Sequence, residues 1–139
     1  MKFHAIRENH LFVKAYKKGR RTTSADLTVF VLPDKHAYLL RRQNPQRRKI
    51  NRIGISTPKS IGNAVERSRV RRIIRAGYCE LLAKYDIKTG FLIVFSARVG
   101  SPASNSHAIF LQLEYAFGRL GMIRLKDPNR EDDGGEFYD

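Results

Sequence analysis

The chain has 139 residues, which is long enough for one domain with a hydrophobic core and too short for two domains of ordinary size. Its 27 lysine and arginine residues outnumber 13 acidic ones, and the formal net charge of +14 favours a polyanionic partner, nucleic acid before an anionic membrane. No apolar run approaches the roughly 20 residues needed to cross a bilayer, and the N-terminus lacks an apolar signal segment. We therefore expect a cytoplasmic protein that does not contact a membrane.

The polar and thiol side chains form no catalytic or metal-binding pattern in the sequence. Cys79 is the only cysteine, so no intrachain disulfide can form, and its apolar helical surroundings indicate a small buried thiol. The histidines are far apart and lack cysteine or paired carboxylate neighbours, so neither a zinc site nor a Ser/His/Asp triad is indicated. No carboxylate cluster suits magnesium either. We expect no catalytic residue and no bound metal in this chain.

The first predicted element is a short helix. Asn9 is a suitable N-cap, and apolar residues recur at helical spacing from Leu11 to Tyr16. Gly19 follows two lysines and ends the helix.

A strand is predicted next, over Asp26–Leu32. This segment is rich in β-branched and aromatic residues and is followed by Pro33. Strand alternation places Phe30 on one face of the sheet and Val29 and Val31 on the other.

A basic, irregular segment separates this strand from the next one. Asp34–Lys49 contains Pro45 and many cationic residues, which predicts an exposed loop after a possible short strand at Tyr38–Leu40. Arg52–Ser56 (RIGIS) is predicted to be a second strand. The sequence TPKSIGN then turns the chain into a long helix.

This long helix, predicted over Asn63–Lys84 and called the arginine helix below, is amphipathic. At about 100° per residue, one arc is apolar and the opposite arc is almost entirely basic. The apolar arc contains Val70, Ile73, Ile74, Gly77 and Leu81. The opposite arc contains Ser68, Arg69, Arg71, Arg72 and Arg75.

The remaining predicted elements are a buried strand and a final helix. Gly90–Arg98 is a continuous apolar run of strand length, as expected for a central strand covered on both faces and parallel to Arg52–Ser56. A helix follows, with Ser104 or Ser106 as its N-cap and Gly121 as its end. Its apolar positions are Ile109, Phe110, Leu113, Phe117 and Leu120.

The C-terminal segment, residues 127–139, differs from the rest of the chain. It holds six acidic residues and one arginine, with too little apolar surface to pack. We therefore predict a single domain over residues 1–126 and a disordered acidic tail. We favour a solvated end without function, and the alternative is a segment that competes with RNA for the basic surface.

Two interpretations of the arginine helix are possible. Its arginines can cover a solvent face with their long side chains, or their guanidinium groups can bind phosphates. We favour phosphate binding because a solvating face normally mixes charges of both signs, whereas this arc has only Glu66 nearby. Like charges at i and i+4 also repel, so a partner outside the chain would relieve that cost.

The aromatic residues near the N-terminus are equally open to two interpretations. Phe12, Tyr16 and Phe30 can be ordinary core residues. They can also form a groove where single-stranded nucleotides stack while the neighbouring lysines contact the RNA backbone. Those lysines are Lys14, Lys17 and Lys18.

Over most of residues 6–122 the chain resembles the protein subunit of bacterial ribonuclease P. The stretch GISTPKSIGNAVERSRVRRIIR is similar to the family signature, in which a strand and a Lys-x-x-Gly-Asn-Ala-Val turn lead into an Arg-Asn-Arg-x-x-Arg helix. NHLFVKAYKKG is similar to the first helix of the family. One departure is Ser68, which stands where the family motif usually has asparagine, and the segment Asp34–Lys49 is longer than usual.

The resemblance implies an α+β fold. It is a small helix-strand-strand-strand-helix-strand-helix sandwich with a left-handed β-α-β crossover, of the type found in the second domain of a small-subunit ribosomal protein. This expectation runs against the general rule, because about 98% of parallel crossovers are right-handed.

The resemblance also implies two RNA-binding surfaces. The first belongs to the arginine helix and the turn before it, and it comprises Lys59, Asn63, Arg67, Ser68, Arg69, Arg71, Arg72 and Arg75. The second is a cleft for the 5′ leader of precursor tRNA, and it comprises Phe12, Tyr16, Lys17 and Phe30.

The function implied is that of an assisting subunit. A large catalytic RNA would bind Mg²⁺ and cut precursor tRNA to make its mature 5′ end, while this chain would bind that RNA one to one and hold the leader. The main alternative is a structural ribosomal or general RNA-binding protein. A regulator that binds double-stranded DNA is less favoured because no short helix with a tight turn precedes the arginine helix. A nuclease in its own right is less favoured still, because no acidic metal site is present.

Overall fold

The computed structural model describes residues 4–35 and 50–126 and the backbone of residues 136–137. Its helices are α1 (Asn9–Lys18), α3 (Ala64–Lys84) and α4 (Ser106–Arg119), with 3-10 turns η1 (Lys59–Ile61) and η2 (Ser101–Ala103). Its strands are β1 (His4–Ala5), β2 (Arg20–Thr23), β3 (Leu27–Pro33), β4 (Arg52–Ser56), β5 (Tyr85–Lys88), β6 (Phe91–Ala97), β7 (Ile123–Leu125) and β8 (Glu136–Phe137).

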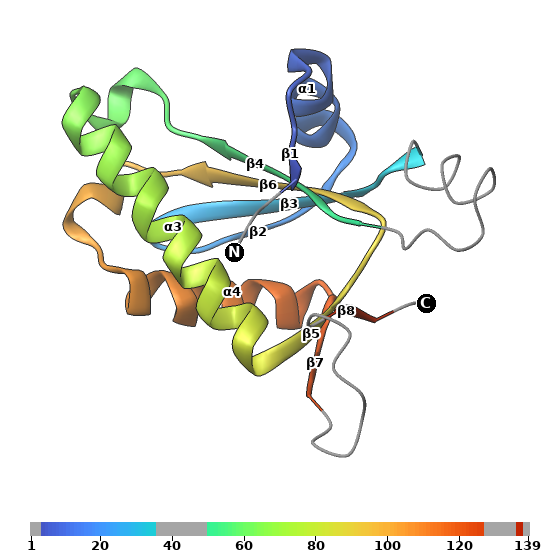
Figure 1. The fold of residues 1–139 in the computed structure, drawn as a ribbon. Helices are drawn as coiled ribbons and strands as arrows, with labels where there is room; N and C mark the ends of the chain where they lie inside the picture. Colours follow the sequence, from blue (N-terminus) through green and yellow to red (C-terminus); the bar gives the residue numbers. More distant parts are fainter. Residues whose placement is uncertain (1–3, 36–49, 127–135, 138–139) are drawn as a thin grey trace.

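The centre of the described part is a five-stranded sheet in the order β1-β4-β6-β3-β2. β4 pairs parallel with β6, and β6 pairs antiparallel with β3, which confirms the predicted parallel crossover and the central position of β6. In Figure 1 these two parallel strands run to the left, α3 lies in front of the sheet, and β6 lies below β4, so the crossover is left-handed. The predicted fold class is thereby confirmed.

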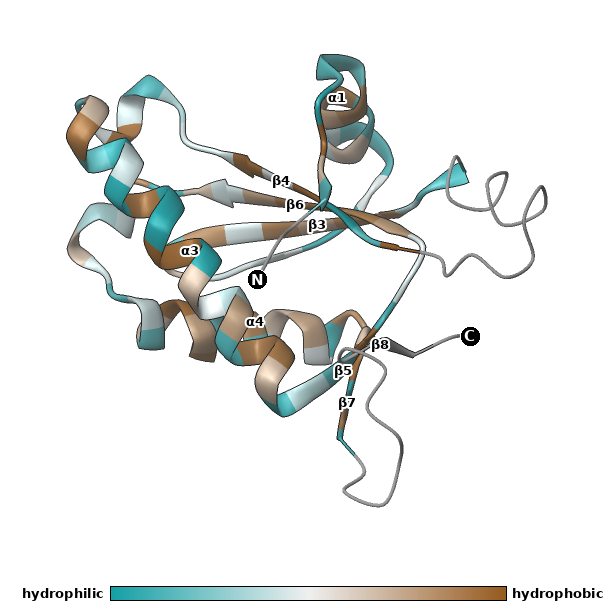
Figure 2. Ribbon diagram, in the orientation of Figure 1, coloured by the Kyte–Doolittle hydropathy of each residue, from teal (hydrophilic) through white to brown (hydrophobic). Residues whose placement is uncertain are grey.

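The sheet separates two hydrophobic clusters. Val29 and Val31 of β3 point into the larger cluster, which α3 and α4 cover. Phe30 points to the opposite face, into a smaller cluster that includes Ala15 of α1. The predicted alternation along β3 is confirmed, and α1 therefore lies across the sheet from the arginine helix, α3. Figure 2 shows the apolar character of β3 and β6, which have neighbours on both faces.

Helix α3 begins at a capping box. The side chain of Asn63 accepts a hydrogen bond from the backbone N–H of Glu66, whose carboxylate accepts one from the backbone N–H of Asn63. The predicted apolar arc of this helix is buried, and Gly77 on that arc allows close contact with α4.

The N-caps of the other two helices differ from the predicted ones. Asn9 is the first residue of α1, and Glu8 occupies the cap position without a side-chain hydrogen bond. Helix α4 is capped by Asn105, whose side chain accepts from the N–H of Ala108, and not by either neighbouring serine. Gly121 has φ +68°, so it ends α4 as predicted.

The described part also contains short strands that the sequence analysis did not predict. β1 and β2 extend the main sheet at its two edges. β5, β7 and β8 form a second sheet, in which the backbone of Glu136–Phe137 pairs parallel with β5. The predicted domain boundary and the predicted disordered tail both stay predictions beside this backbone pairing. The possible strand at Tyr38–Leu40 lies outside the described residues.

Candidate nucleic-acid interface

A groove of about 550 Å³ runs along β4 between α1 and α3. Its walls combine apolar side chains with two guanidinium groups. The lining residues are Ala5, Ile6, Phe12, Ile53, Gly54, Ile55, Arg71, Arg75, Ala76 and Cys79. We call it the β4 groove.

Phe12 lies against the floor of the β4 groove because Gly54 has no side chain. A Cβ atom at position 54 would lie 2.6 Å from Cζ of Phe12, far inside van der Waals contact. The glycine within a strand therefore allows the ring of α1 to approach the β4 backbone directly.

The β4 groove brings together residues that the sequence analysis assigned to separate surfaces. Phe12 was predicted for the leader cleft, and Arg71 and Arg75 for the arginine helix, yet all three line the same groove. An aromatic ring on one side and two cations on the other form a surface on which a nucleotide base and its phosphates can both find partners.

The two other cleft aromatics lie next to each other, at the contact between α1 and β3. The ring centroids of Tyr16 and Phe30 are 5.0 Å apart in an edge-to-face arrangement. Phe30 is only 7% exposed and belongs to the small core, whereas Tyr16 is 38% exposed. Lys17, also assigned to the cleft, is exposed. Tyr16 can therefore meet a ligand directly, and Phe30 supports it from below.

The basic arc of α3 divides into exposed and folded-back arginines. Arg72 and Arg75 are exposed. Arg69 is partly buried and donates from Nη2 to the carbonyl oxygen of Ser104 at 3.0 Å. Arg71 donates to the hydroxyl oxygen of Thr57 at 2.6 Å. Arg69 thus joins α3 to the C-terminal end of η2, and its predicted role in RNA binding stays a prediction.

The remaining predicted RNA-binding residues surround the start of α3. Lys59 on η1 and Asn63 at the cap are exposed, and Arg67 is partly buried. The Asn63 side chain is already engaged in the capping box. The hydroxyl oxygen of Ser68 accepts a hydrogen bond from Nη2 of Arg71 at 3.2 Å. Ser68 therefore helps to orient one of the two arginines that line the β4 groove.

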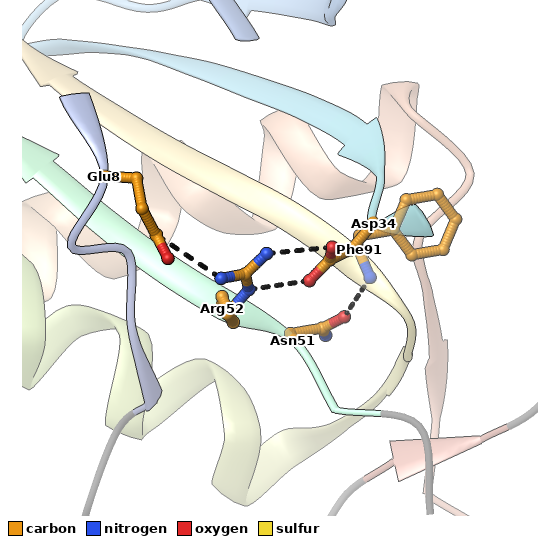
Figure 3. A network of polar contacts seen from close by, with 5 residues as sticks. All are labelled: Glu8, Asp34, Asn51, Arg52 and Phe91. Carbon is orange, nitrogen blue, oxygen red and sulfur yellow. Dashed lines mark hydrogen bonds and ion pairs between the residues drawn. The ribbon is translucent and has the colours of Figure 1, made fainter. Parts of the chain in front are cut away.

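An ion-pair network fixes the position of α1 relative to the sheet (Figure 3). Arg52 at the start of β4 donates to both carboxylate oxygens of Asp34, at 2.7 and 2.9 Å, and lies 3.5 Å from Glu8, which precedes α1. The hydrogen bond to Asp34 raises the pKa of the already basic Arg52. The neighbouring Asn51 accepts a hydrogen bond from the backbone N–H of Phe91. The network joins α1, β3, β4 and β6 beside the groove.

Sequence analysis missed several groove residues. Gly54 could have been found, because a glycine inside a strand often marks a close approach of another group. Cys79 was expected to be buried, but it is partly exposed on the groove wall. The sequence did not indicate that Ala5 and Ile6 belong to the groove wall, because β1 is only two residues long and has no recognisable strand pattern.

Within the described ranges, no group of three or more histidine, cysteine, aspartate or glutamate side chains is placed to hold a metal ion. No helix among the described residues is long and apolar enough to span a membrane.

The chain matches known proteins over most of its length. The family model described as Ribonuclease P matches residues 1–121. The ribonuclease P protein component of Bacillus cereus (strain Q1) is 32% identical over 125 residues, which cover 90% of this chain and 97% of the relative. The corresponding protein of Clostridioides difficile (strain 630) is 35% identical over 96 residues, which cover 69% of this chain and 73% of the relative.

Solved structures agree in fold. The RNase P protein of Staphylococcus aureus aligns with a TM-score of 0.67 at 24% identity, covering 88% of this chain and 100% of that one. The RNase P protein of Thermotoga maritima aligns with a TM-score of 0.60 at 17% identity, covering 81% and 93%. With the fold, the capped arginine helix and the extended sequence match in agreement, this chain belongs to the ribonuclease P protein family.

Proposed function

We propose that this chain binds the catalytic RNA of ribonuclease P, one protein to one RNA, and holds the 5′ leader of precursor tRNA while that RNA cuts. The observation that carries the proposal is the β4 groove, which Phe12 lines together with Arg71 and Arg75. A leader is single-stranded, so its bases are free to stack on aromatic rings while cations contact its phosphates. The chain's part is binding and orientation, and the cleavage chemistry belongs to the RNA.

The two classes of residue have different roles in this proposal. The exposed arginines of α3, Arg72 and Arg75, contact phosphates of the catalytic RNA and of the leader where it enters the groove. Phosphate contacts position the RNA without reading its sequence. The accessible aromatics, Phe12 and Tyr16, stack on leader bases, which is tolerant of sequence because every base has a π face. A subunit built this way can serve many precursors.

Magnesium ions that support cleavage are assigned to the catalytic RNA in this proposal. RNA phosphates repel one another, and dissolved cations screen that repulsion. A protein that contributes fixed cations beside both RNAs lowers the concentration of magnesium needed to bring them together. The chain's own acidic residues have no part in this step.

The proposal is tested by adding the purified chain to catalytic RNA and precursor tRNA at low magnesium. The expected result is cleavage at the mature 5′ end that is slow with RNA alone and restored by the protein. A chain that binds both RNAs without raising the cleavage rate would instead be a structural or general RNA-binding protein.

Arg72→Ala combined with Arg75→Ala is expected to weaken binding to the catalytic RNA and to flatten its dependence on salt. Each lost phosphate contact lowers the slope of log affinity against log salt by roughly 0.7 to 0.9. Both side chains are exposed, so circular dichroism is expected to show an intact fold. The matched control is Lys35→Ala with Lys126→Ala, which removes the same charge from two residues that do not line the groove. Equal slopes for both double variants would contradict the assignment.

A further inference from the structure

A second basic hollow lies at the opposite edge of the main sheet, between β2 and the end of α4. It has a volume of about 560 Å³ and is lined by Arg20, Arg21, Thr22, Thr23, Tyr115, Arg119 and Leu120. We call it the β2 hollow. β2 and β4 are separated by β3 and β6 in the sheet, so at roughly 4.8 Å per strand the two sites are about 14 Å apart or more. Occupation of the β4 groove therefore leaves the β2 hollow free.

The charges of the β2 hollow are all of one sign. Arg20, Arg21 and Arg119 are exposed, and no acidic residue lines the hollow. Among the described residues, none of these three guanidinium groups forms an ion pair. Strand alternation places Arg20 on the α4 face of β2 and Arg21 on the opposite face, so Arg20 and Arg119 are the two unneutralised cations on the side of Tyr115. A bound anion would remove the repulsion between them.

An exposed aromatic ring stands among these cations. Tyr115 is 55% exposed. The guanidinium carbon of Arg119 lies 5.9 Å from the centre of the Tyr115 ring. A ring paired with a guanidinium group in this way is the combination on which unpaired nucleotide bases stack.

Protection of the sheet edge offers a structural explanation for part of this arrangement. β2 is an edge strand, and charged residues on edge strands prevent pairing with other chains. That explanation covers Arg20 and Arg21, but it does not explain why Tyr115 and Arg119 of a different element face the same hollow. Convergence of cations and a ring from two elements indicates a binding surface.

We propose that the β2 hollow is a second RNA-binding surface, in which Arg20 and Arg119 contact the phosphates of an RNA strand and an unpaired base stacks on Tyr115. This inference goes beyond the proposed function, because it concerns residues on the far edge of the sheet. The strand can belong to the catalytic RNA or to the precursor tRNA, and both present the same phosphates and unpaired bases. A protein with RNA-binding surfaces at both sheet edges can contact two segments at once, which raises overall affinity through effective concentration.

The first test uses the full chain and an oligouridylate probe containing 4-thiouridine. Photo-crosslinking followed by mass spectrometry is expected to place one crosslink at Tyr115, in addition to any at the β4 groove. Arg20→Gln with Arg119→Gln is expected to remove that crosslink and to lower the salt slope by about 1.4, because single-stranded RNA loses about 0.7 per phosphate contact. Lys35→Gln with Lys126→Gln is the charge-matched control. This variant is expected to keep both the crosslink at Tyr115 and the salt slope of the unsubstituted chain.

The outcomes of this test distinguish an RNA-binding role of the β2 hollow from a role of its arginines in protecting the sheet edge. An unchanged crosslink and slope, with new dimers in size-exclusion chromatography, would mean that the arginines only protect the edge, and the inference would be overturned. If the double variant does not fold, Tyr115→Leu serves instead, since it keeps an apolar side chain at an exposed position. Tyr115→Leu is expected to weaken oligouridylate binding without changing the salt slope, and unchanged affinity would overturn the inference.

The source of the strand is identified in reconstituted holoenzyme. 4-Thiouridine is placed in the catalytic RNA in one preparation and in the precursor tRNA in another, and the RNA that crosslinks at Tyr115 is the partner. Cleavage at low magnesium is measured in the same samples. If the protein stimulates cleavage normally but no crosslink forms at Tyr115, the inference that the β2 hollow binds RNA is overturned. The proposed function stays intact in that case.

Discussion

Single residues determine whether the β4 groove has room for a ligand. Gly54 lets the Phe12 ring lie against the strand, and Ile6 approaches from the other side, with Cδ1 only 3.3 Å from the position of an added Cβ. The Phe12 ring is half-buried, so it can be displaced toward the groove opening. A side chain at position 54 would therefore change the shape of the groove at its floor.

Gly54→Ala is expected to displace the Phe12 ring and to reduce stability by about 1–3 kcal/mol, the usual cost of overpacking. The affinity of the holoenzyme for precursor tRNA is also expected to fall, because the displaced ring changes the floor of the β4 groove. Urea unfolding and holoenzyme binding measure the two effects. Adding Phe12→Leu relieves the clash, so the double variant should be less destabilised than the sum of the single variants. Strict additivity would show that the glycine and the ring do not interact.

At residue level, the sequence predicted which kind of group the site would bind better than it predicted which way each side chain points. A run of arginines on one arc indicates phosphate binding, and Arg72 and Arg75 are exposed as that prediction requires. Arg69 belongs to the same arc but folds back to a carbonyl 35 residues away in the sequence. Helical periodicity contains no information about such a tertiary partner. Phe30 and Tyr16 differ for the same reason, because the ring of Phe30 is covered by the small cluster that includes Ala15 of α1, whereas Tyr16 stays exposed.

At the scale of whole elements, the contact between α3 and α4 holds the arginine helix in place. Gly77 lies where the two helices are closest, and an added Cβ would lie 2.7 Å from Cγ2 of Ile109 and 3.0 Å from the backbone oxygen of Ser106. Backbone atoms cannot move aside as a flexible side chain can. The absence of a side chain at Gly77 therefore sets the distance between the helices.

Gly77→Ala is expected to push α4 away from α3 and to lower the free energy of unfolding by about 1–3 kcal/mol. The matched control is Gly118→Ala on α4, where an added Cβ meets nothing within 4 Å. That control is expected to be neutral or to stabilise by up to about 1 kcal/mol, through helix propensity alone. Chemical denaturation of both variants provides the comparison. Similar effects at the two glycines would contradict the close-packing argument.

A polar cluster joins α4 to the end of α3 and the start of β5. Glu114 of α4 accepts from the hydroxyl of Tyr85 at 2.6 Å and pairs with Lys84 at 3.0 Å. The hydrogen bond from Tyr85, followed by that from Lys84, lowers the pKa of Glu114. Because the folded-state pKa is depressed, the stabilisation is present above the unfolded-state pKa of about 4.3 and is lost as the pH falls through the folded-state value.

Tyr85→Phe is expected to bring the pKa of Glu114 closer to its ordinary value. The variant should be less stable than the wild type near neutral pH, and the difference should shrink in acid below about pH 4.3. Urea unfolding across this pH range measures the change. Glu114→Gln removes the titrating group altogether, so its stability should likewise depend less on pH in this range. A Tyr85→Phe difference that is constant with pH would show that the hydroxyl does not act through this carboxylate.

Long, periodic elements could be predicted and short edge elements could not. The bounds of β4 and the end of α3 at Lys84 agree with prediction, because hydrophobic pattern and turn residues coincide there. β2 (Arg20–Thr23) has no apolar residue and forms only because β3 offers a free edge. β5 begins directly after α3, with no glycine or proline between them to mark the change. Such strands depend on tertiary pairing, which local pattern does not contain.

At the scale of the whole molecule, the sheet separates two hydrophobic clusters, and the proposed recognition residues come from the helices on both of its faces. One face carries the large core with α3 and α4, and the other carries the smaller cluster with α1. The β4 groove lies along one edge of this sheet, where side chains of α1 and α3 both reach it. Because α3 connects β4 to β6, its residues Arg71 and Arg75 line the same groove along β4 as Phe12 of α1, although the two helices are distant in sequence. A left-handed crossover on this topology could be expected only from the family resemblance.

The most direct measurement compares the affinity of reconstituted holoenzyme for precursor tRNA and for mature tRNA, with Tyr16→Ala as the test variant. Val13→Ala is the matched control, since Val13 is also exposed on α1, at 41%. Each stacked base contributes roughly 1–3 kcal/mol, so Tyr16→Ala should weaken precursor binding by about 5-fold or more while leaving mature tRNA binding and the fold unchanged. Equal weakening for both RNAs, or an equal effect of Val13→Ala, would contradict leader recognition by this surface.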